Sequence, residues 1–148
     1  MSLVEKIDQE IIKALKGGEK YRLTVLRGLK SDLKYKQIGT GKDLPVELVI
    51  EVLSSAAKRR RESIEQYRKG DRDDLVKQEE FELTVITEFL PKQLSEDELR
   101  ELVKSAVEEA GATSPKQMGQ VMKVLMPKIK GRADGKMASR LISEFLAN

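Results

Sequence analysis

SPKQMGQVMKVLMPKIKGRADGKMASRLISEF, residues Ser114 to Phe145, predicts two short helices joined by a basic turn. Ser114 is expected to cap the first helix, with Pro115 in its first position. We expect Pro127 to end this helix, because proline lacks the N–H group that the helix interior requires. The apolar residues of the first helix recur at helical spacing, at Met118, Val121, Met122 and Leu125. The segment is therefore predicted to fold as two short helices with a turn between them.

The second helix of this segment is expected to begin at Asp134, whose carboxylate can accept hydrogen bonds from free backbone N–H groups. Its predicted buried residues are Ala138, Leu141, Ile142 and Phe145. Basic residues crowd the turn and its flanks, where Asp134 is the one acid before Glu144. Such a cluster favours contact with a polyanion, although basic loops are also common as solvated surface. The predicted nucleic-acid-binding residues are Lys123, Lys128, Lys130, Arg132, Lys136 and Arg140.

The composition narrows the classes of function. Charged residues make up 36% of the 148 residues, but the net charge is only +3, so a basic patch must be local. Cys, His and Trp are absent, which excludes disulfides, thiol nucleophiles and the commonest metal ligands. We expect no metal and no cofactor. Because no apolar run approaches the roughly 20 residues of a membrane span, and no hydrophobic signal core begins the chain, we expect a cytoplasmic protein without membrane contact.

Apolar residues recur at helical spacing along the whole chain, which predicts an all-α protein. We expect an N-terminal four-helix domain over residues 1–92 and a C-terminal three-helix domain over residues 93–148. The predicted N-terminal helices cover residues 2–16, 19–38, 45–69 and 73–89, with a loop at 39–43, and a further helix is expected at 95–110.

Three finer expectations concern the N-terminal domain. Gly28 lies inside a predicted helix, where it costs about 1 kcal/mol relative to Ala, and close approach of a neighbouring helix would explain it. Asp71 or Asp73 is expected to cap the fourth helix. The apolar residues of that helix spread widely around it, so we expect it to be the central, most covered element of the bundle.

A second basic run, Lys58-Arg59-Arg60-Arg61, lies within the third predicted helix. At about 100° per residue, Arg60 projects toward the apolar stripe. We expect its stem to cover apolar surface and its guanidinium to pair with a carboxylate. Lys58, Arg59 and Arg61 are either solvated surface or a second phosphate-facing patch.

The sequence contains no recognisable catalytic constellation. Six serines lie within predicted helices rather than at a glycine-flanked turn: Ser54, Ser55, Ser63, Ser105, Ser139 and Ser143. Lys58 follows Ser54 by four residues, but such helical neighbours are frequent by chance. The acidic runs Asp73-Asp74 and Glu96-Asp97-Glu98 stand where helix first turns favour acids. The pattern therefore favours a binding module over an enzyme.

Three segments resemble the GatB/YqeY family: AAKRRRESIEQY (Ala56–Tyr67), FLPKQLSEDEL (Phe89–Leu99) and MGQVMKVLMPKIKGRADGKMASRLI (Met118–Ile142). The resemblance covers essentially the whole chain. It is closest to free-standing YqeY-like proteins, which are similar to the C-terminal tail of the B subunit of tRNA-dependent Asp/Glu amidotransferase. That enzyme belongs to the carbon–nitrogen ligases that use glutamine as amido-nitrogen donor.

The resemblance implies a four-helix domain, a smaller three-helix domain and contact with tRNA. It also implies a role in translation, and an amidotransferase or another translation component as a possible protein partner. The chain has no counterpart of the kinase-like cradle domain of the B subunit, nor of the amidase subunit. We therefore expect no amidotransferase reaction from this chain alone. Met118, Gly119 and Met122 form either an adaptable surface for a protein partner or part of the core.

Overall fold

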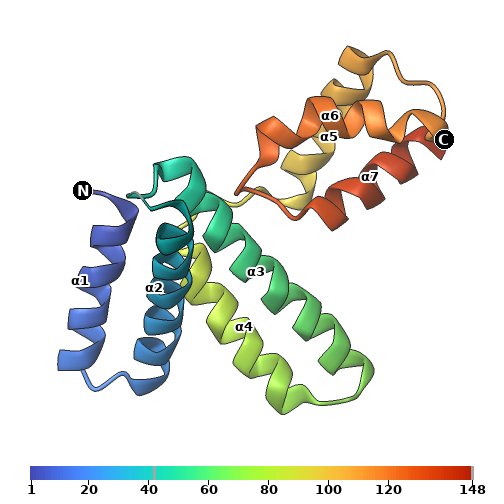
Figure 1. The fold of residues 1–148 in the computed structure, drawn as a ribbon. Helices are drawn as coiled ribbons and strands as arrows, with labels where there is room; N and C mark the ends of the chain where they lie inside the picture. The colour runs from blue at the N-terminus through green and yellow to red at the C-terminus, as the bar shows by residue number, and fades with distance from the viewer. Residues whose placement is uncertain (42, 148) are drawn as a thin grey trace. The chain divides into compact units, whose positions relative to one another are not determined.

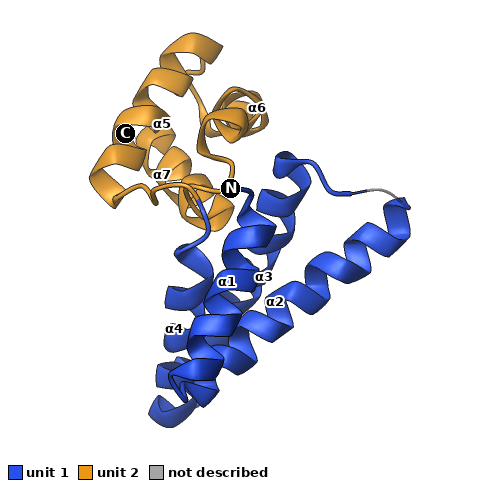
Figure 2. Ribbon diagram, turned by 90° about the vertical axis from the view of Figure 1, so that its left-hand side faces the viewer, with its two compact units in different colours: residues 1–90 blue, residues 91–148 orange. Residues whose placement is uncertain are grey.

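The computed structural model describes residues 1–41 and 43–147, and these residues form an all-α fold without strands (Figure 1). The helices are α1 (Leu3–Lys16), α2 (Lys20–Thr40), α3 (Val46–Lys69), α4 (Asp73–Thr87), α5 (Glu96–Ala110), α6 (Met118–Ile129) and α7 (Gly135–Ala147). A single 3₁₀ turn, η1 (Pro115–Gln117), precedes α6. The chain forms two compact units, residues 1–90 with α1–α4 and residues 91–148 with α5–α7 (Figure 2). The all-α prediction is confirmed.

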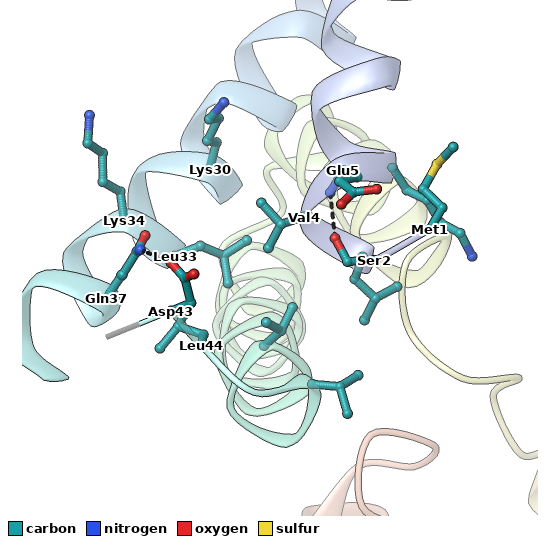
Figure 3. A pocket seen from close by; sticks show the side chains of 14 residues that line it. Met1, Ser2, Val4, Glu5, Lys30, Leu33, Lys34, Gln37, Asp43 and Leu44 are labelled. Carbon is teal, nitrogen blue, oxygen red and sulfur yellow. Dashed lines mark hydrogen bonds between the residues drawn. The ribbon is translucent and has the colours of Figure 1, made fainter. Parts of the chain in front are cut away.

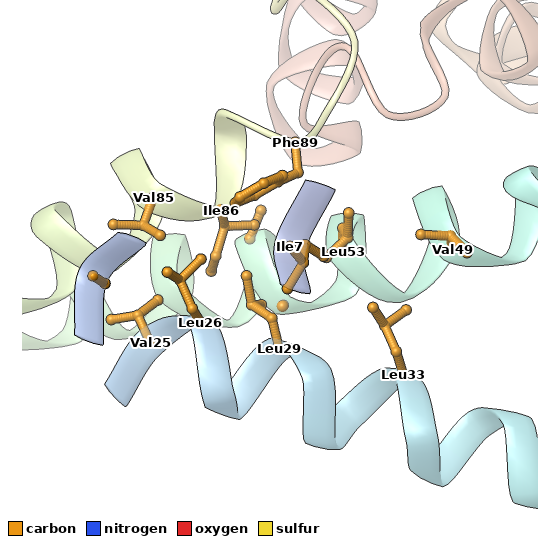
Figure 4. Packing of buried hydrophobic residues seen from close by; sticks show 13 residues of the cluster. Ile7, Val25, Leu26, Leu29, Leu33, Val49, Leu53, Val85, Ile86 and Phe89 are labelled. Atoms are coloured by element: carbon orange, nitrogen blue, oxygen red, sulfur yellow. The ribbon is translucent and has the colours of Figure 1, made fainter. Parts of the chain in front are cut away.

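The N-terminal unit is built from two helix pairs. Helix α1 packs on α2, α3 packs on α4, and α2 also contacts α3 and α4. The core between them is aliphatic, with one aromatic ring contributed from beyond the end of α4 (Figure 4). Its fully buried members include Ile7, Leu26, Leu29, Leu53, Val85 and Ile86. Burial of such side chains contributes about 25 cal/mol per Å² of apolar surface and is the main force holding the unit together.

Helix α4 is not the central element that its apolar residues predict. It contacts α2 and α3, whereas α2 and α3 each contact three neighbouring helices. The side chain of Phe81, one of the apolar residues of α4, is 43% exposed. The N-cap position is held by Arg72 and no side chain caps the helix, so the expectation of an aspartate cap is wrong. The helix ends at Thr87, two residues before the predicted end.

Gly28 and Gly39 also differ from expectation. Gly28 is exposed, and a Cβ built on it would have no neighbour within 4 Å, so no close helix approach explains it. Helix α2 continues through Gly39 and Thr40, which the sequence places in a loop, and ends where Gly41 adopts a left-handed φ of 70°. The rest of the predicted loop includes Lys42, which lies outside the described residues.

The C-terminal unit is packed around Leu99, Val103, Leu125 and Ile142, all at most 1% exposed. Helix α6 continues through Pro127 to Ile129, contrary to expectation. Ile129 extends the stripe of Leu125 by one turn and is 1% exposed, so its burial offsets the hydrogen bond that proline removes. In α7 the buried residues include Leu146 rather than Phe145, which is 42% exposed. Met118 and Met122 are half-buried and pack against this core.

Candidate nucleic-acid interface

The turn between α6 and α7 is fixed by the segment that precedes α5. The amide of Leu94 donates to the carbonyl of Arg132 at 2.8 Å. The side-chain amide of Gln93 donates to the carbonyl of Gly131 at 2.7 Å and to that of Pro91 at 3.0 Å. The turn passes through Gly131 with φ 77°, a left-handed conformation that favours glycine. The basic turn is therefore held in one shape by contacts that sequence spacing does not reveal.

Local hydrogen bonds complete the turn. The amides of Arg132 and Ala133 donate to the carbonyl of Ile129 at the end of α6. Asp134 accepts from the amide of Lys136 at 3.2 Å, which confirms its predicted N-cap role at α7. On the other side, Ser95 and Glu98 form a capping box that begins α5. The backbone amide of Ser95 donates to Glu98 and lowers the pKa of that carboxyl.

Lys128 and Arg140, both predicted binding residues, are paired with acids. Lys128 on α6 lies 2.8 Å from Glu109 of α5. Arg140 on α7 lies 2.7 Å from Glu96 and 3.5 Å from Glu144. All these side chains are at least 42% exposed. Exposed ion pairs typically contribute about 0–1 kcal/mol, so a phosphate can replace any of these three acids at low cost.

The other four predicted residues are placed differently. Lys123 and Lys130 are exposed, and neither forms an ion pair within residues 1–41 and 43–147. Arg132 is half-buried, and its Nε lies 3.5 Å from the carbonyl oxygen of Lys92. Lys136 is exposed in the first turn of α7. The cations best placed to meet a partner are therefore Lys123 and Lys130.

The second basic run belongs largely to the protein's own structure. Arg59 lies 3.2 Å from Asp32 of α2, and Arg61 is half-buried, which leaves Lys58 as the fully exposed cation without an ion pair in the described chain. Arg60 is 23% exposed and its Nε lies 3.2 Å from Glu82 and 3.7 Å from Glu79 of α4. The predicted pairing of Arg60 is confirmed.

Glu79 is the acid most affected by this packing. Burial raises its pKa, the neighbouring carboxylate of Glu82 raises it further, and Arg60 partly offsets both effects. Its Oε2 is buried and accepts no hydrogen bond within the described residues. The Arg60 pair therefore links α3 to α4 with one carboxylate that is incompletely satisfied.

One basic face was not recognised from the sequence. Lys20-Tyr21, Arg27-Gly28 and Lys34-Tyr35 recur at seven-residue spacing on the solvent side of α2. All six residues are exposed. The signal that reveals this face is the spacing of cations and aromatics on the helix side opposite the leucine stripe.

The N-terminal unit also contains a pocket of about 670 Å³ between the start of α1, the second half of α2 and the start of α3 (Figure 3). Apolar side chains such as Val4, Leu33 and Val49 line much of it. Its polar groups are partly engaged with one another, since Gln37 donates to Asp43 at 2.8 Å and Ser2 accepts from the Glu5 amide at 3.1 Å. Among the described residues that line the pocket, no group of three or more acids is placed to hold a metal ion.

We also searched the described residues for a metal site, an activated serine and a membrane-spanning helix. No group of three or more Asp and Glu side chains is placed to hold a metal ion among residues 1–41 and 43–147. The hydroxyl of Ser54 is buried and forms no hydrogen bond there, so it has no activating base. None of the described helices combines the length and the apolar character that crossing a membrane requires.

Comparison with known proteins gives consistent matches. A family model described as "Yqey-like protein" matches residues 4–146. The chain is 32% identical over 115 residues to "Altered inheritance of mitochondria protein 41, mitochondrial" of Lachancea thermotolerans, covering 76% of this chain and 62% of that protein. The protein of the same name from Pyrenophora tritici-repentis is 30% identical over 154 residues, covering 97% of this chain and 81% of that protein. An uncharacterized protein of Schizosaccharomyces pombe is 30% identical over 90 residues, covering 60% and 72% respectively. The chain thus spans less than two thirds of the length of the first of these relatives.

Proposed function

Because the chain belongs to the Yqey-like protein family, we propose that it is a non-catalytic tRNA-binding accessory module related to the tail of glutamine-dependent tRNA amidotransferase. The observation that carries the proposal is the fixed shape of the basic turn. Hydrogen bonds from the side chain of Gln93 and the backbone of Leu94 hold residues 131 and 132 in place, while Lys123 and Lys130 remain exposed and unpaired within the described chain. A positioned cation loses less conformational freedom on binding a phosphate than one on a mobile loop.

The paired cations add to this surface. Because these ion pairs are exposed, a phosphate that approaches α6 can replace Glu109 as the partner of Lys128. A phosphate that approaches α7 can likewise replace Glu96 as the partner of Arg140. The turn itself holds Lys130 and Arg132. Phosphate contacts position a protein on RNA without reading its sequence, so selectivity for one tRNA is not expected from these residues alone.

Binding of fluorescently labelled tRNA to the intact chain tests the proposal. We expect Lys123/Lys130→Gln to weaken binding severalfold and to reduce the log–log salt slope by about 1.4, at about 0.7 per cation. Lys128/Arg140→Gln should have a smaller effect, because those cations already have partners. The matched control is Lys77/Lys104→Gln, which removes two exposed cations of α4 and α5 that form no ion pair with any described residue. Equal binding by all four proteins would contradict the proposal.

A second candidate function is a protein-interaction module that docks on an amidotransferase or another translation component. The observation that favours it is the exposure of Met126, Met137 and Phe145 in the C-terminal unit, at 43%, 38% and 42%. Methionine side chains adapt to varied partner surfaces. Affinity purification after nuclease treatment tests it: a partner that survives nuclease and is lost in Met126/Met137→Gln supports docking, and loss of all partners with RNA contradicts it.

We propose the cytoplasm as the location and translation as the process served. The names of the two fungal relatives carry the word "mitochondrial", which describes those proteins. Imaging of the native chain with an internal or C-terminal label would separate the two locations. We further expect the purified chain to show no glutaminase activity, and measurable ammonia release from glutamine would contradict its non-catalytic role.

A further inference from the structure

The solvent face of α2 presents a regular double row of side chains. Seven residues are nearly two helical turns, so Lys20, Arg27 and Lys34 fall in one row at about 10.5 Å intervals. Tyr21, Gly28 and Tyr35 form a second row about 100° further around the helix. The opposite side of the helix is the buried one, with Val25, Leu26, Leu29 and Leu33. The double row therefore faces solvent along most of the helix.

The cations of this face are unpaired. Lys20, Arg27 and Lys34 are exposed, and none forms an ion pair with any residue that the structure describes. Two other cations of the same helix behave differently. Arg22 is held by Glu10 at 3.0 Å and by Glu88 at 2.7 Å, and Lys30 is held by Asp8. The three cations of the face thus form a positive row without internal counterions.

The single acid of α2 does not neutralise this row. Asp32 is paired with Arg59 of α3 at 3.2 Å. At 100° per residue it also lies more than 120° around the helix from Arg27 and Lys34. The row of cations is accordingly positive over about 21 Å of helix length.

The tyrosines are the second sign of a binding surface. The chain has only three tyrosines, and two of them stand on this face with 84% and 83% of their surface exposed. Such exposure gives the rings no packing energy within the fold. Exposed aromatic rings between cations are the usual platform on which unpaired bases stack. Gly28, midway between the rings, has no heavy atom within 4 Å of a built Cβ, so a partner's backbone can approach closely there.

We propose that this face of α2 binds RNA whose unpaired bases lie beside its phosphates. Phosphates contact Lys20, Arg27 and Lys34, and bases stack on Tyr21 and Tyr35. The inference rests on the proposed function in naming RNA as the partner, but it concerns a separate surface on residues 1–90. It gives the N-terminal unit a binding role of its own.

A lipid surface fits the face less well. Helices that lie on membranes bury an apolar side in the lipid. The apolar side of α2 is used in the core, and on the exposed face Ile38 is the one large aliphatic residue that the structure describes. Thr24 and Ser31 lie between the two rows and are exposed, as suits hydrogen bonding to a polar backbone.

The test compares three variants of the intact chain with labelled tRNA, a single-stranded RNA and an RNA duplex over a range of salt. Lys20/Arg27/Lys34→Gln should weaken binding of all three RNAs and reduce the log–log salt slope by about 2, at about 0.7 per cation. Tyr21/Tyr35→Ala should weaken single-stranded RNA and tRNA by about fivefold or more per ring while leaving the slope unchanged. Lys6/Lys77/Lys104→Gln removes the same charge from exposed positions elsewhere and should change little. Circular dichroism confirms that each variant keeps its helices.

The outcomes separate this inference from the proposed function. Weakening in the two α2 variants but not in the control supports the inference. If only Lys123/Lys130→Gln weakens tRNA binding, the inference fails and the proposed function stands. If only the α2 variants weaken it, the inference stands and the α6–α7 turn is not the site. Absence of RNA binding by the intact chain overturns both the inference and the proposed function. The same holds if the chain binds phosphatidylserine vesicles through α2 and binds no RNA.

Discussion

The backbone amide of Leu94 donates a 2.8 Å hydrogen bond to the carbonyl of Arg132 and joins two segments that lie 38 residues apart. Leu94 belongs to the stretch FLPKQLSEDEL, and Arg132 to the stretch that contains GRADG. The two segments that carry the strongest family resemblance therefore meet in space, and one fixes the shape of the other. This contact turns a basic loop into a positioned surface.

Gln93 is expected to be the side chain that stabilises this contact. In Gln93→Ala, the carbonyls of Gly131 and Pro91 lose their shared donor, at a cost of about 1 kcal/mol in the free energy of unfolding. Chemical denaturation measures the loss, and hydrogen exchange should show faster exchange of the amides of residues 130–134. Gln120→Ala, at an exposed position of α6, serves as control. Unchanged exchange in the turn would contradict this role for Gln93.

Gly131 is expected to be intolerant of any side chain. Its φ of 77° is a left-handed conformation that costs an L-residue about 1–2 kcal/mol. Gly131→Ala should therefore lower the free energy of unfolding by about that amount, measured by urea titration. A neutral substitution would mean that the turn relaxes into another conformation at no cost.

Gly28 gives the opposite expectation for the same substitution. Gly28→Ala places its methyl group in open space on a regular helix, so helix propensity alone decides the outcome. The variant should be more stable by about 0.5–1 kcal/mol. Thermal unfolding measures the gain, and a lower melting temperature would show that Gly28 has a structural role that the fold does not reveal.

Glu79 should make the stability of the N-terminal unit depend on pH. Its pKa is raised in the folded chain, so protonation favours folding below the ordinary value near 4.3, and this contribution is lost as pH rises through the folded pKa. Glu79→Gln, which is uncharged at every pH, should therefore be more stable than the original chain at pH 7 and about equal to it at pH 4. Denaturation at the two pH values tests this. A variant that is less stable at pH 7 would show that attraction to Arg60 outweighs burial.

The helices could be predicted because their signals are local. The stripe of Leu26, Leu29 and Leu33, and the capping box of Ser95 and Glu98, need only residues within two turns of one another. Errors arose where distant residues decide the outcome. Burial of Ile129 carries α6 past Pro127, and the open side of α4 leaves Phe81 exposed. Neither the burial of Ile129 nor the exposure of Phe81 can be predicted from the spacing of apolar residues in the sequence.

The sequence predicts where cations gather in the candidate site, but it does not predict which of them form ion pairs. The cluster of cations around the α6–α7 turn is evident in the sequence, whereas the pairing of Lys128 with Glu109 and of Arg140 with Glu96 depends on how α5 packs. In the sequence of α2 the leucine stripe is the stronger pattern, and it predicts only which side of the helix is buried. The proposal for the basic face of α2 rests on the exposure of its side chains and on the absence of counterions among the described residues, and both are known only from the fold.

The salt dependence of tRNA binding by the intact chain tests the central claim most directly. Lys123 and Lys130 on one surface, and Lys20, Arg27 and Lys34 on the other, predict a log–log slope of about −3.5, at about 0.7 per cation. Affinity should then fall by about a hundredfold between roughly 50 and 200 mM salt. A flat dependence, or no binding even at the lowest salt, would contradict the claim that this helical protein presents its cations to RNA.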